Sequence, residues 1–377
     1  MSRSSDLPDR QTFDRRVAAV QDRLDSGIAD GVVCFPSSNL QYLTGIAETP
    51  GERHFLYLTP ADGDPALLVP ELSLADVRET VPETEIRSWG DDEDPLPAVR
   101  ALIADRGVLE GRLLVDDTMW ARFTQDLREA APKATWGLAN EVLGDVRARK
   151  DEVEIATIER ASGITDAVVG DLRTLGSDAV GMTEAELAEW IDERLSDRGG
   201  ETPAFETIVG SGPNGAKPHH HHSDRTIEVG DPVVLDFGTR VDGYPSDQTR
   251  TLVFGGDPTD RFREIHGIVR RAHQAGVEAI EPGVPASEID RVVRSTIEAA
   301  GYGEAFIHRT GHGVGIDVHE EPYVVAGNER PLEAGMVLSV EPGIYLPDEF
   351  GVRIEDLVVV TEGGCRRLNH TDRGWSC

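Results

Sequence analysis

Residues 232–250, PVVLDFGTRVDGYPSDQTR, place two acidic residues in a pattern otherwise typical of a β-hairpin. An apolar run leads directly into Asp236, although aspartate is depleted in strands and an unpaired buried carboxylate is costly. The Asp-Gly pair at 242–243 predicts a two-residue turn, so that residue 249 faces Asp236 and Asp247 lies diagonally from it on the same face. Two carboxylates that converge without a cation repel each other, and one of them takes up a proton. The hairpin therefore predicts a metal site.

The composition describes a long and strongly acidic chain. Its 377 residues suffice for two domains, and its net charge of −32 argues against nucleic acids and acidic membrane surfaces as partners. Among 37 basic residues, only Lys133, Lys150 and Lys217 are lysines. A composition with many acidic residues and few lysines resembles that of proteins from salt-loving microbes. There, a screening length of about 3 Å near 1 M salt makes the repulsion between carboxylates tolerable. We therefore expect a halophilic protein, with an ordinary acidic protein as the alternative.

The cysteines and the N-terminal residues favour a cytoplasmic location. Cys34, Cys365 and Cys377 show no paired spacing, so no disulfide framework is expected. The first ten residues, MSRSSDLPDR, lack the apolar core of a signal peptide, and no apolar run approaches the ~18 residues of a membrane span. We expect a cytoplasmic protein that does not associate with membranes.

The first part of the chain, residues 1–145, is predicted to be an α/β domain. Apolar residues spaced by four, three and four positions predict a helix over 11–27. Short apolar runs then alternate with helical patterns. The segment 36–46, PSSNLQYLTGI, is expected to be a surface loop, although its Asn39 and Tyr42 could reach a site elsewhere. The predicted strands lie at 32–35, 55–58, 67–69 and 113–115, and the other predicted helices near 98–105 and 120–131.

The second part, residues 150–377, follows a break in composition at VRARK, residues 146–150. A long helix is predicted over 151–174, and the pattern T-x-x-E from Thr183 to Glu186 is a capping box that predicts the start of another. Together, the two parts predict a two-domain α/β (α+β) protein. Further helices are expected near 259–280 and 286–300, and strands near 207–210, 232–254, 335–341 and 352–360.

Histidines and two further acids concentrate the chemistry in this second part. Nine of the eleven histidines fall within 219–319, and HRTGHGVGIDVH at 308–319 interleaves three of them with glycines, which let the backbone approach a bound centre closely. Glu341 ends an apolar strand, and Glu355 lies in another strand with Arg353 on the same face. For either glutamate alone, a surface position on an edge strand is the simpler interpretation. Together, four carboxylates and an imidazole suit two divalent ions of the Mn²⁺ or Co²⁺ kind better than structural zinc.

The order and surroundings of five residues resemble those of the metal ligands in the pita-bread metallopeptidases, which include Xaa-Pro aminopeptidase, prolidase and methionine aminopeptidase. These residues are Asp236, Asp247, His312, Glu341 and Glu355. The resemblance covers the second part most closely, and the first part resembles the creatinase/prolidase N-terminal domain. It implies that Asp236 binds one metal, that Asp247 and Glu355 bridge both, and that His312 and Glu341 bind the second. It also implies a homodimer, with Mn or Co as the expected metal and Zn or Fe as alternatives.

The resemblance extends to residues that would contact a substrate. FETIVGSGPNGAKPHHHHSD, residues 205–224, is similar to a family segment in which the histidine after proline is functional, and here this histidine is His219. Which member of the run from His219 to His222 acts stays open. By the same resemblance, His308 and His319 line the substrate site, and Arg353 supports the end that carries Glu355.

The resemblance also implies a reaction, which is removal of the first residue from short peptides with proline in the second position. Hydroxide generated at the two metals attacks the scissile carbonyl, and Glu341 takes and passes on the proton. His319 would stabilise the oxyanion, and His308 would hold the residue after the cut. The preference for proline comes from the resemblance alone.

Two other functions stay open. The chain could be a non-catalytic peptide- or protein-binding module, but such modules, like creatinase-like amidinohydrolases, lose metal ligands that are present here. It could also be a general aminopeptidase without proline preference, although methionine aminopeptidases usually lack the N-terminal domain. Within the proline-specific branch, the sequence does not separate Xaa-Pro dipeptidases from Xaa-Pro aminopeptidases, which accept longer peptides.

Overall fold

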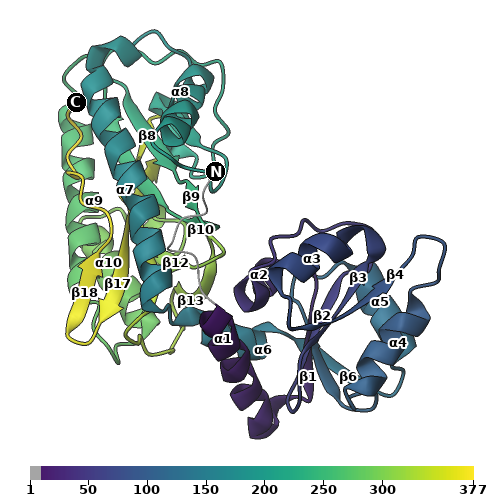
Figure 1. Cartoon of the computed structure of the whole chain (residues 1–377). Coiled ribbons are helices and arrows are strands. Elements are labelled where there is room, and N and C mark those ends of the chain that lie inside the picture. The colour runs from purple at the N-terminus through teal and green to yellow at the C-terminus, as the bar shows by residue number, and fades with distance from the viewer. Residues whose placement is uncertain (1–9) are drawn as a thin grey trace. The chain divides into compact units, whose positions relative to one another are not determined.

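Two structural units divide between Arg147 and Ala148 in the computed structural model, which describes residues 10–377 (Figure 1). Each unit encloses a hydrophobic core of its own. The predicted two-domain α/β architecture is therefore confirmed. Across the described range, no helix is long and apolar enough to cross a membrane.

The first unit is built on a six-stranded mixed sheet in the order β4-β3-β2-β1-β5-β6. Its apolar strands β1 to β3 are buried along their whole length, as expected for continuous apolar runs, and residues such as Leu58 and Phe123 join the sheet to the helices in one core. The elements are α1 (Arg10–Arg23), η1 (Leu24–Ile28), β1 (Gly31–Cys34), α2 (Ser38–Thr44), β2 (Leu56–Pro60), β3 (Ala66–Pro70), η2 (Glu71–Ser73), α3 (Leu74–Thr80), β4 (Glu85–Trp89), α4 (Leu96–Asp105), β5 (Arg112–Val115), α5 (Ala121–Ala130), β6 (Thr135–Leu138) and α6 (Asn140–Ala148).

The segment predicted as a surface loop, 36–46, is a helix instead. Helix α2 starts at a serine N-cap and ends at Gly45, whose φ of 76° lies in the left-handed region that glycine adopts without strain. Asn39 and Tyr42 are buried within this unit. With 7 residues, α2 makes about two turns, which is too short for a helical period to appear in the sequence.

Four long helices and two main sheets form the second unit. The capping box predicted at Thr183 is present, since its hydroxyl accepts the N–H of Glu186 at 3.1 Å and the Glu186 carboxylate accepts the N–H of Thr183 at 2.8 Å. Helix α7 starts with the same motif at Asp151. The helical elements are α7 (Glu152–Leu175), η3 (Gly176–Ala179), α8 (Glu184–Asp197), η4 (Gly212–Ala216), α9 (Asp260–Glu278), α10 (Ala286–Ala299) and η5 (Gly303–Ala305).

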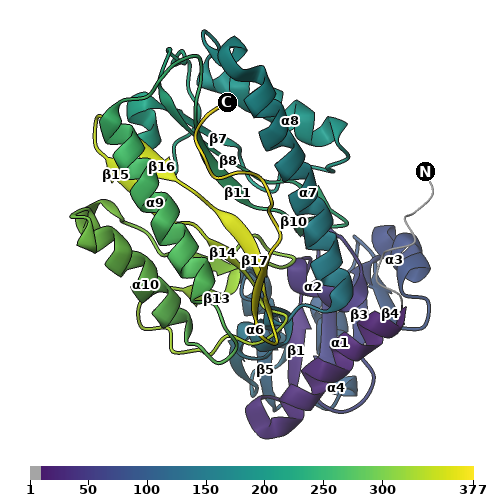
Figure 2. The same cartoon turned by 90° about the vertical axis from the view of Figure 1, so that its left-hand side faces the viewer.

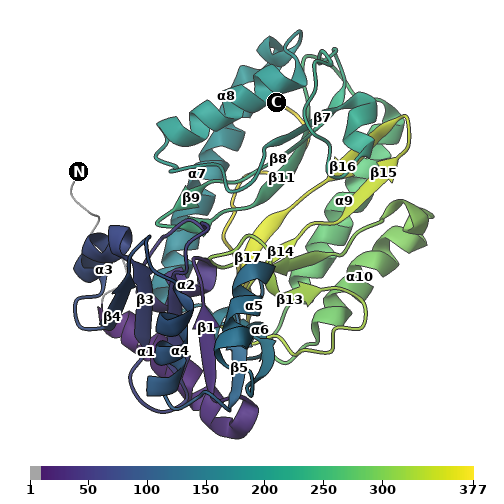
Figure 3. The same cartoon turned by 90° about the vertical axis from the view of Figure 1, so that its right-hand side faces the viewer.

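The strands of this unit form a three-stranded sheet, β11-β8-β7, a five-stranded sheet, β13-β12-β14-β17-β18, and two small hairpins. Figure 2 shows the helices in front of these strands, and Figure 3, from the opposite side, shows the strands in front. The strands are β7 (Ile208–Ser211), β8 (Pro232–Phe237), β9 (Arg240–Val241), β10 (Tyr244–Pro245), β11 (Gln248–Val253), β12 (Gly311–Gly313), β13 (Glu320–Val324), β14 (Val337–Val340), β15 (Gly343–Leu346), β16 (Phe350–Arg353), β17 (Asp356–Thr361) and β18 (Gly364–Arg367).

The register of the β8–β11 hairpin agrees with the sequence prediction. Thr249 pairs with Asp236, and the turn residues Asp242 and Gly243 have positive φ angles of 48° and 82°. The strand predicted over 352–360, in contrast, is divided in two. Strand β16 ends before Ile354 and β17 begins after Glu355, because these strands pair with different partners, β15 and β14.

Candidate active site

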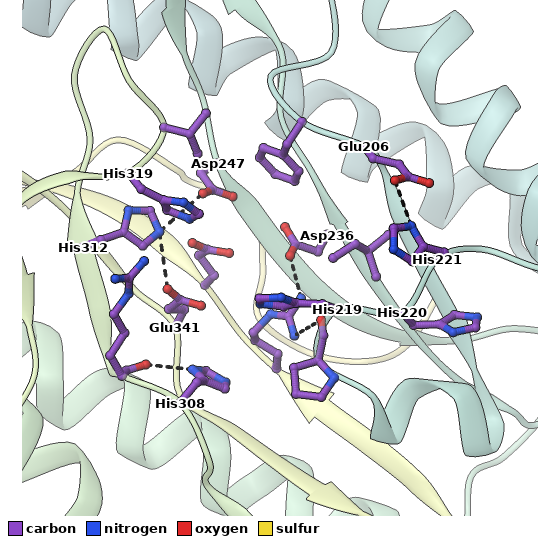
Figure 4. Close-up of a pocket in the computed structure, with 17 residues that line it drawn as sticks. Glu206, His219, His220, His221, Asp236, Asp247, His308, His312, His319 and Glu341 are labelled. Atoms are coloured by element: carbon purple, nitrogen blue, oxygen red, sulfur yellow. Dashed lines mark hydrogen bonds and ion pairs between the residues drawn. The ribbon is translucent and has the colours of Figure 1, made fainter. Parts of the chain in front are cut away.

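One pocket in the second unit is lined by all nine residues that the sequence singled out (Figure 4). The ligand candidates come from β8, from the start of β11, from β12 and from the ends of β14 and β16. Residues as far apart in the chain as Asp236 and Glu355 therefore meet in one place. The nine are Asp236, Asp247, His312, Glu341 and Glu355, together with His219, His308, His319 and Arg353.

The pairing of strands explains why these distant residues meet. Strands β14 and β17 are neighbours, and their register places Glu341 beside Glu355. The backbone N–H of Glu355 donates to the carbonyl oxygen of Thr249 at 3.1 Å, which joins this sheet to the hairpin. That hairpin carries Asp236 and Asp247 on one face, so four carboxylates converge on the pocket.

His312 has the orientation of a metal-ligating histidine. Its Nδ1 lies 3.1 Å from the carbonyl oxygen of Gly313, so Nδ1 carries the proton and donates it. The lone pair of Nε2 then faces carboxylate oxygens, 3.4 Å from Glu341 and 3.7 Å from Asp247. Lone pairs placed against each other repel unless a cation lies between them. In metal sites, a neutral histidine ligand usually donates its other ring N–H to an oxygen atom of the protein, as Nδ1 of His312 does here. The donor set therefore fits a divalent metal ion.

The neighbouring acids complete this fit. Ligand atoms of Asp247, His312 and Glu355 lie within 4.8 Å of one another, and all three side chains are buried. Asp236 turns Oδ2 toward Arg353, whose guanidinium donates to it at 2.5 Å. Its Oδ1 is buried and has no hydrogen-bond partner within residues 10–377. A buried oxygen without a donor costs about 1–3 kcal/mol, which a bound cation at this position would offset.

Burial and mutual repulsion raise the pKa values of three pocket acids, Asp247, Glu341 and Glu355. Burial, followed by the charge of Glu355, raises the pKa of Asp247 well above its ordinary value, and burial with the charge of Glu341 does the same for Glu355. Burial also raises the pKa of Glu341 to about 7, although Arg353 opposes this shift. For His312, burial lowers the pKa to about 3, which keeps the ring neutral. These acids therefore resist ionising together unless a cation neutralises their charge.

A chain of hydrogen bonds links the substrate residues to these acids. The guanidinium of Arg353 donates to Asp236 and, at 2.8 Å, to the hydroxyl of Tyr345. The Tyr345 proton is therefore directed to Nε2 of His308, 2.8 Å away, and Nδ1 of His308 donates to the Arg309 carbonyl at 2.7 Å. Burial, followed by the charge of Arg353, lowers the pKa of His308 to about 4 and favours this neutral form. Both ring nitrogens of His308 are occupied, so it offers a ligand its ring edge.

The four consecutive histidines have different partners. Three of the rings are hydrogen-bonded to the protein: His220 to Glu184 at 2.8 Å, His221 to Glu206 at 2.9 Å and His222 to the carbonyl oxygen of Thr207 at 3.1 Å. The ring of His219 makes no hydrogen bond to any described residue, and it lies in the pocket next to Asp236 (Figure 4). His219 is therefore the member of the run that is free to contact a ligand.

Sequence reasoning missed the roles of several residues in or beside the pocket. Tyr345 gave no signal, and Thr249 was identified only as the residue that faces Asp236. In the structure, the Thr249 hydroxyl donates to Glu355 at 2.7 Å and accepts from Arg353 at 3.1 Å. Arg309 stands beside a predicted substrate histidine in HRTGH, and this position could have identified it. An apolar wall is formed by Phe205, Ile208 and Val318.

Comparisons with known proteins agree with this geometry. Residues 156–362 match the model of metallopeptidase family M24, and residues 16–149 match the creatinase/prolidase N-terminal domain. The probable dipeptidase PepE of Mycobacterium tuberculosis is 40% identical over 367 residues, which cover 96% of each chain. The Xaa-Pro dipeptidase of Lactobacillus helveticus is 38% identical and covers 89% of this chain and 91% of its own. The crystal structure of dipeptidase PepE from Mycobacterium ulcerans has a TM-score of 0.92 at 38% identity and covers 100% of this chain and 99% of its own. This chain therefore belongs to metallopeptidase family M24, with a creatinase/prolidase N-terminal domain preceding its pita-bread domain.

Proposed function

We propose that this chain is a metal-dependent Xaa-Pro dipeptidase, which releases the first residue from dipeptides with proline in the second position. The observation that carries the proposal is His312, whose Nε2 lone pair faces two acids in a pocket with the family's full set of donors. Relatives named Xaa-Pro dipeptidase, at 34–38% identity over most of the chain, support the substrate class.

We assign the metal ligands to the five residues singled out in the sequence, namely Asp236, Asp247, His312, Glu341 and Glu355. Divalent ions bound there would lower the pKa of a water molecule and polarise the scissile carbonyl. The oxygen-rich donor set favours Mn²⁺ or Co²⁺ over Zn²⁺ or Fe²⁺, and two ions are expected because four carboxylates exceed what one ion needs.

The other pocket residues would divide the remaining tasks. Glu341, whose carboxylate lies 3.4 Å from His312 in the pocket, would accept and return the proton of the attacking water. The ring nitrogens of His319 have no hydrogen-bond partner among the described residues and can donate to the oxyanion. His308 presses its ring edge toward the residue after the cut, where proline, which lacks an N–H, needs no acceptor. His219, whose ring has no hydrogen-bond partner among the described residues, would also contact the substrate.

The preference for dipeptides is supported by Arg309. Its guanidinium lies 4.5 Å from the centre of the Tyr323 ring, and Arg309 lines the pocket together with Glu341 and His319. Within the described part of the chain, no carboxylate forms an ion pair with it. A dipeptide carries its carboxylate one residue beyond the scissile bond, and a free guanidinium in the pocket can bind that group.

The test is a panel of peptides with the Mn²⁺-loaded enzyme and quantification of free methionine. Met-Pro should be cleaved rapidly, Met-Ala and Met-Pro-Ala much more slowly, and acetyl-Met-Pro not at all, because acetylation removes the amine that binds near the metals. Arg309→Met should lower kcat/KM for Met-Pro by roughly tenfold or more, the loss expected for a charge-assisted contact, and leave Met-Pro-Ala nearly unchanged. Arg291→Met, which removes an exposed arginine from α10, is the matched control.

Two outcomes would change the assignment. Equal rates on Met-Pro and Met-Ala would indicate a general aminopeptidase, and equal rates on Met-Pro and Met-Pro-Ala would indicate an Xaa-Pro aminopeptidase. Absence of bound metal in the purified protein, together with no cleavage of any peptide after metal addition, would favour the non-catalytic binding module.

Three further properties complete the proposal. The resemblance predicts a homodimer, which sedimentation would detect, and three free cysteines favour function in the reducing cytoplasm. The charge of −32 with three lysines predicts a halophilic enzyme whose melting temperature rises between dilute buffer and molar KCl, because salt screens the repulsion between carboxylates. A melting temperature that does not change with KCl would contradict the halophilic prediction and leave the enzymatic one untouched.

A further inference from the structure

Glu184 is a buried carboxylate of the second unit that does not belong to the metal site. It receives an unusual number of hydrogen bonds. It is the first residue of α8 and is fully buried. Six donor groups reach it: the backbone N–H and hydroxyl of Ser211, both at 2.7 Å, the amide of Asn214 at 3.1 Å, Nε2 of His220 at 2.8 Å, and the N–H and hydroxyl of Ser223 at 3.1 and 2.6 Å. A carboxylate offers about four lone-pair directions, so Glu184 is saturated.

Surrounding groups fix the direction of these bonds. Arg225 donates to the Ser211 hydroxyl at 2.7 Å, which leaves the Ser211 proton for Glu184. The backbone N–H of Arg225 similarly donates to the Ser223 hydroxyl, and Lys217 donates to the Asn214 carbonyl oxygen at 3.0 Å, so that the Asn214 amide must donate. The cluster therefore requires an acceptor at both oxygens of residue 184, which glutamate supplies and glutamine does not.

All six donors belong to one stretch of chain, Ser211–Ser223, which we call the histidine loop. Ser211 and Ser223 are its two ends, and Asn214 and His220 lie between them. The loop also contains His219, the histidine that is free in the pocket. One carboxylate thus holds both ends and the middle of the loop that carries a substrate-facing residue.

The loop is also packed closely against the strands that carry metal-site residues. A Cβ on Gly351 would lie 1.9 Å from the carbonyl oxygen of Gly215, so η4 and β16 touch through glycines. At the end of β16, Arg353 donates to the carbonyl oxygen of Pro218 at 3.3 Å and also to Asp236. Displacement of the loop would therefore move His219 relative to the acids of the pocket.

We propose that Glu184 is a positioning residue, which fixes the histidine loop so that His219 faces the substrate at the metal site. The proposal rests on the proposed function for the role of His219. It is distinct from helix capping, because the capping box of α8 is formed by Thr183 and Glu186. Glu186 lies about half a turn along the same helix, and among the described residues its carboxylate is hydrogen-bonded only to Thr183, which makes it a matched control.

The experiment compares four variants of the full-length, Mn²⁺-loaded enzyme on Met-Pro: Glu184→Gln, His219→Ala, the double variant and Glu186→Gln. Glu184→Gln should lower kcat/KM by about 10- to 100-fold, since a displacement of about 1 Å can cost about 100-fold. In the His219→Ala background the same change should add less than about threefold, because residues that act through one another are not additive. Glu186→Gln should stay within about twofold of wild type.

A second measurement does not depend on activity. Backbone hydrogen exchange in residues 211–223 should become faster in Glu184→Gln and remain unchanged in Glu186→Gln, with bound metal and exchange in the remaining residues preserved. If Glu184→Gln fails to fold, His220→Ala removes a single donor and should show the same pattern at smaller amplitude. His220→Gln retains a side chain that donates, and it should largely restore the wild-type exchange.

The outcomes separate this proposal from the proposed function. Independent, multiplicative losses from Glu184→Gln and His219→Ala would overturn positioning through His219, and unchanged exchange in residues 211–223 would overturn the role of Glu184 in holding the loop. If the wild-type enzyme does not cleave Met-Pro, the proposed function fails, and the exchange measurement still decides whether Glu184 holds the loop.

Discussion

Glu184 and the pocket acids Asp247 and Glu355 are all buried in the second unit, but their surroundings have opposite effects on ionisation. Burial alone would raise the pKa of Glu184, but hydrogen bonds from Ser223, Ser211 and His220 outweigh it and lower the pKa to about 2. In the pocket, burial and neighbouring acids raise the pKa of Glu341 to about 7 and move that of Asp247 in the same direction.

The difference lies in the supply of donors rather than in burial. Glu184 receives neutral hydrogen bonds at both oxygens and needs no cation. Asp236 has a buried oxygen with no donor in the described residues, and Glu341 accepts only a long bond from Ser339 at 3.4 Å. Acids left without donors are suited to bind a metal or a proton, whereas acids with many donors are suited to hold a loop in place.

The largest expected effect is the loss of the metal centre. Asp247→Asn should abolish measurable turnover and lower metal content while leaving the fold largely intact, because it removes a charge that we assign to both ions. Turnover on Met-Pro and metal per chain are the measurements. Asp242→Asn on the same hairpin keeps a residue that tolerates the positive φ of the turn and should stay active. Near-normal turnover with full metal content in Asp247→Asn would contradict the five-ligand assignment.

The next effect concerns the proton transfer. Glu341→Gln should lower kcat by about 10²- to 10⁴-fold and change KM little, because the lost interaction belongs to the transition state. Steady-state kinetics on Met-Pro at saturating Mn²⁺ would measure both parameters. A rise in KM with kcat unchanged would make Glu341 a binding residue and not the proton carrier.

A smaller effect should appear in the metal-free protein. In the folded state Glu341 keeps its proton up to about pH 7, whereas in the unfolded chain it releases the proton near pH 4.5. Protonation of Glu341 therefore contributes to the free energy of unfolding, and this contribution is complete below pH 4.5 and is lost as the pH rises through about 7. The melting temperature of EDTA-treated protein should fall across this window, at about 2–4 °C per kcal/mol. Mn²⁺ should stabilise more at pH 8 than at pH 5.5. Glu341→Gln should reduce the dependence without removing it, because the pKa values of Asp247 and Glu355 are raised as well. A melting temperature that rises across the window would contradict the raised pKa.

The smallest effect has the opposite sign and comes from Glu184. Its lowered pKa contributes stability that is present above pH 4.5 and is lost as pH falls toward about 2. The difference in melting temperature between wild type and Glu184→Gln should therefore be constant from pH 8 to pH 5 and shrink below pH 4.5. A difference that grows on acidification would place Glu184 with the metal-site acids and remove the contrast between the two regions.

Much of this molecule follows from local sequence patterns. The hairpin register at Asp236 and the capping box at Thr183 depend on residues a few positions apart, and the structure has both as predicted. The failures are also local. The segment 36–46 is too short to show a helical period, and the break at Glu355 comes from a change of strand partner that no neighbouring residue announces.

The sequence by itself identified the candidate donors, because strand periodicity, the Asp-Gly turn and the glycine-spaced histidines are short-range features, and the family resemblance suggested a role for each. Only the tertiary structure decided how each one is used. In the sequence, Glu184 is an ordinary acid in the first turn of a helix. In the structure, residues 27 to 39 positions away in the chain donate hydrogen bonds to it. His219 differs from its three neighbours only because their rings find partners elsewhere. Ionisation and orientation depend on burial and on long-range hydrogen bonds, and the fold alone creates these.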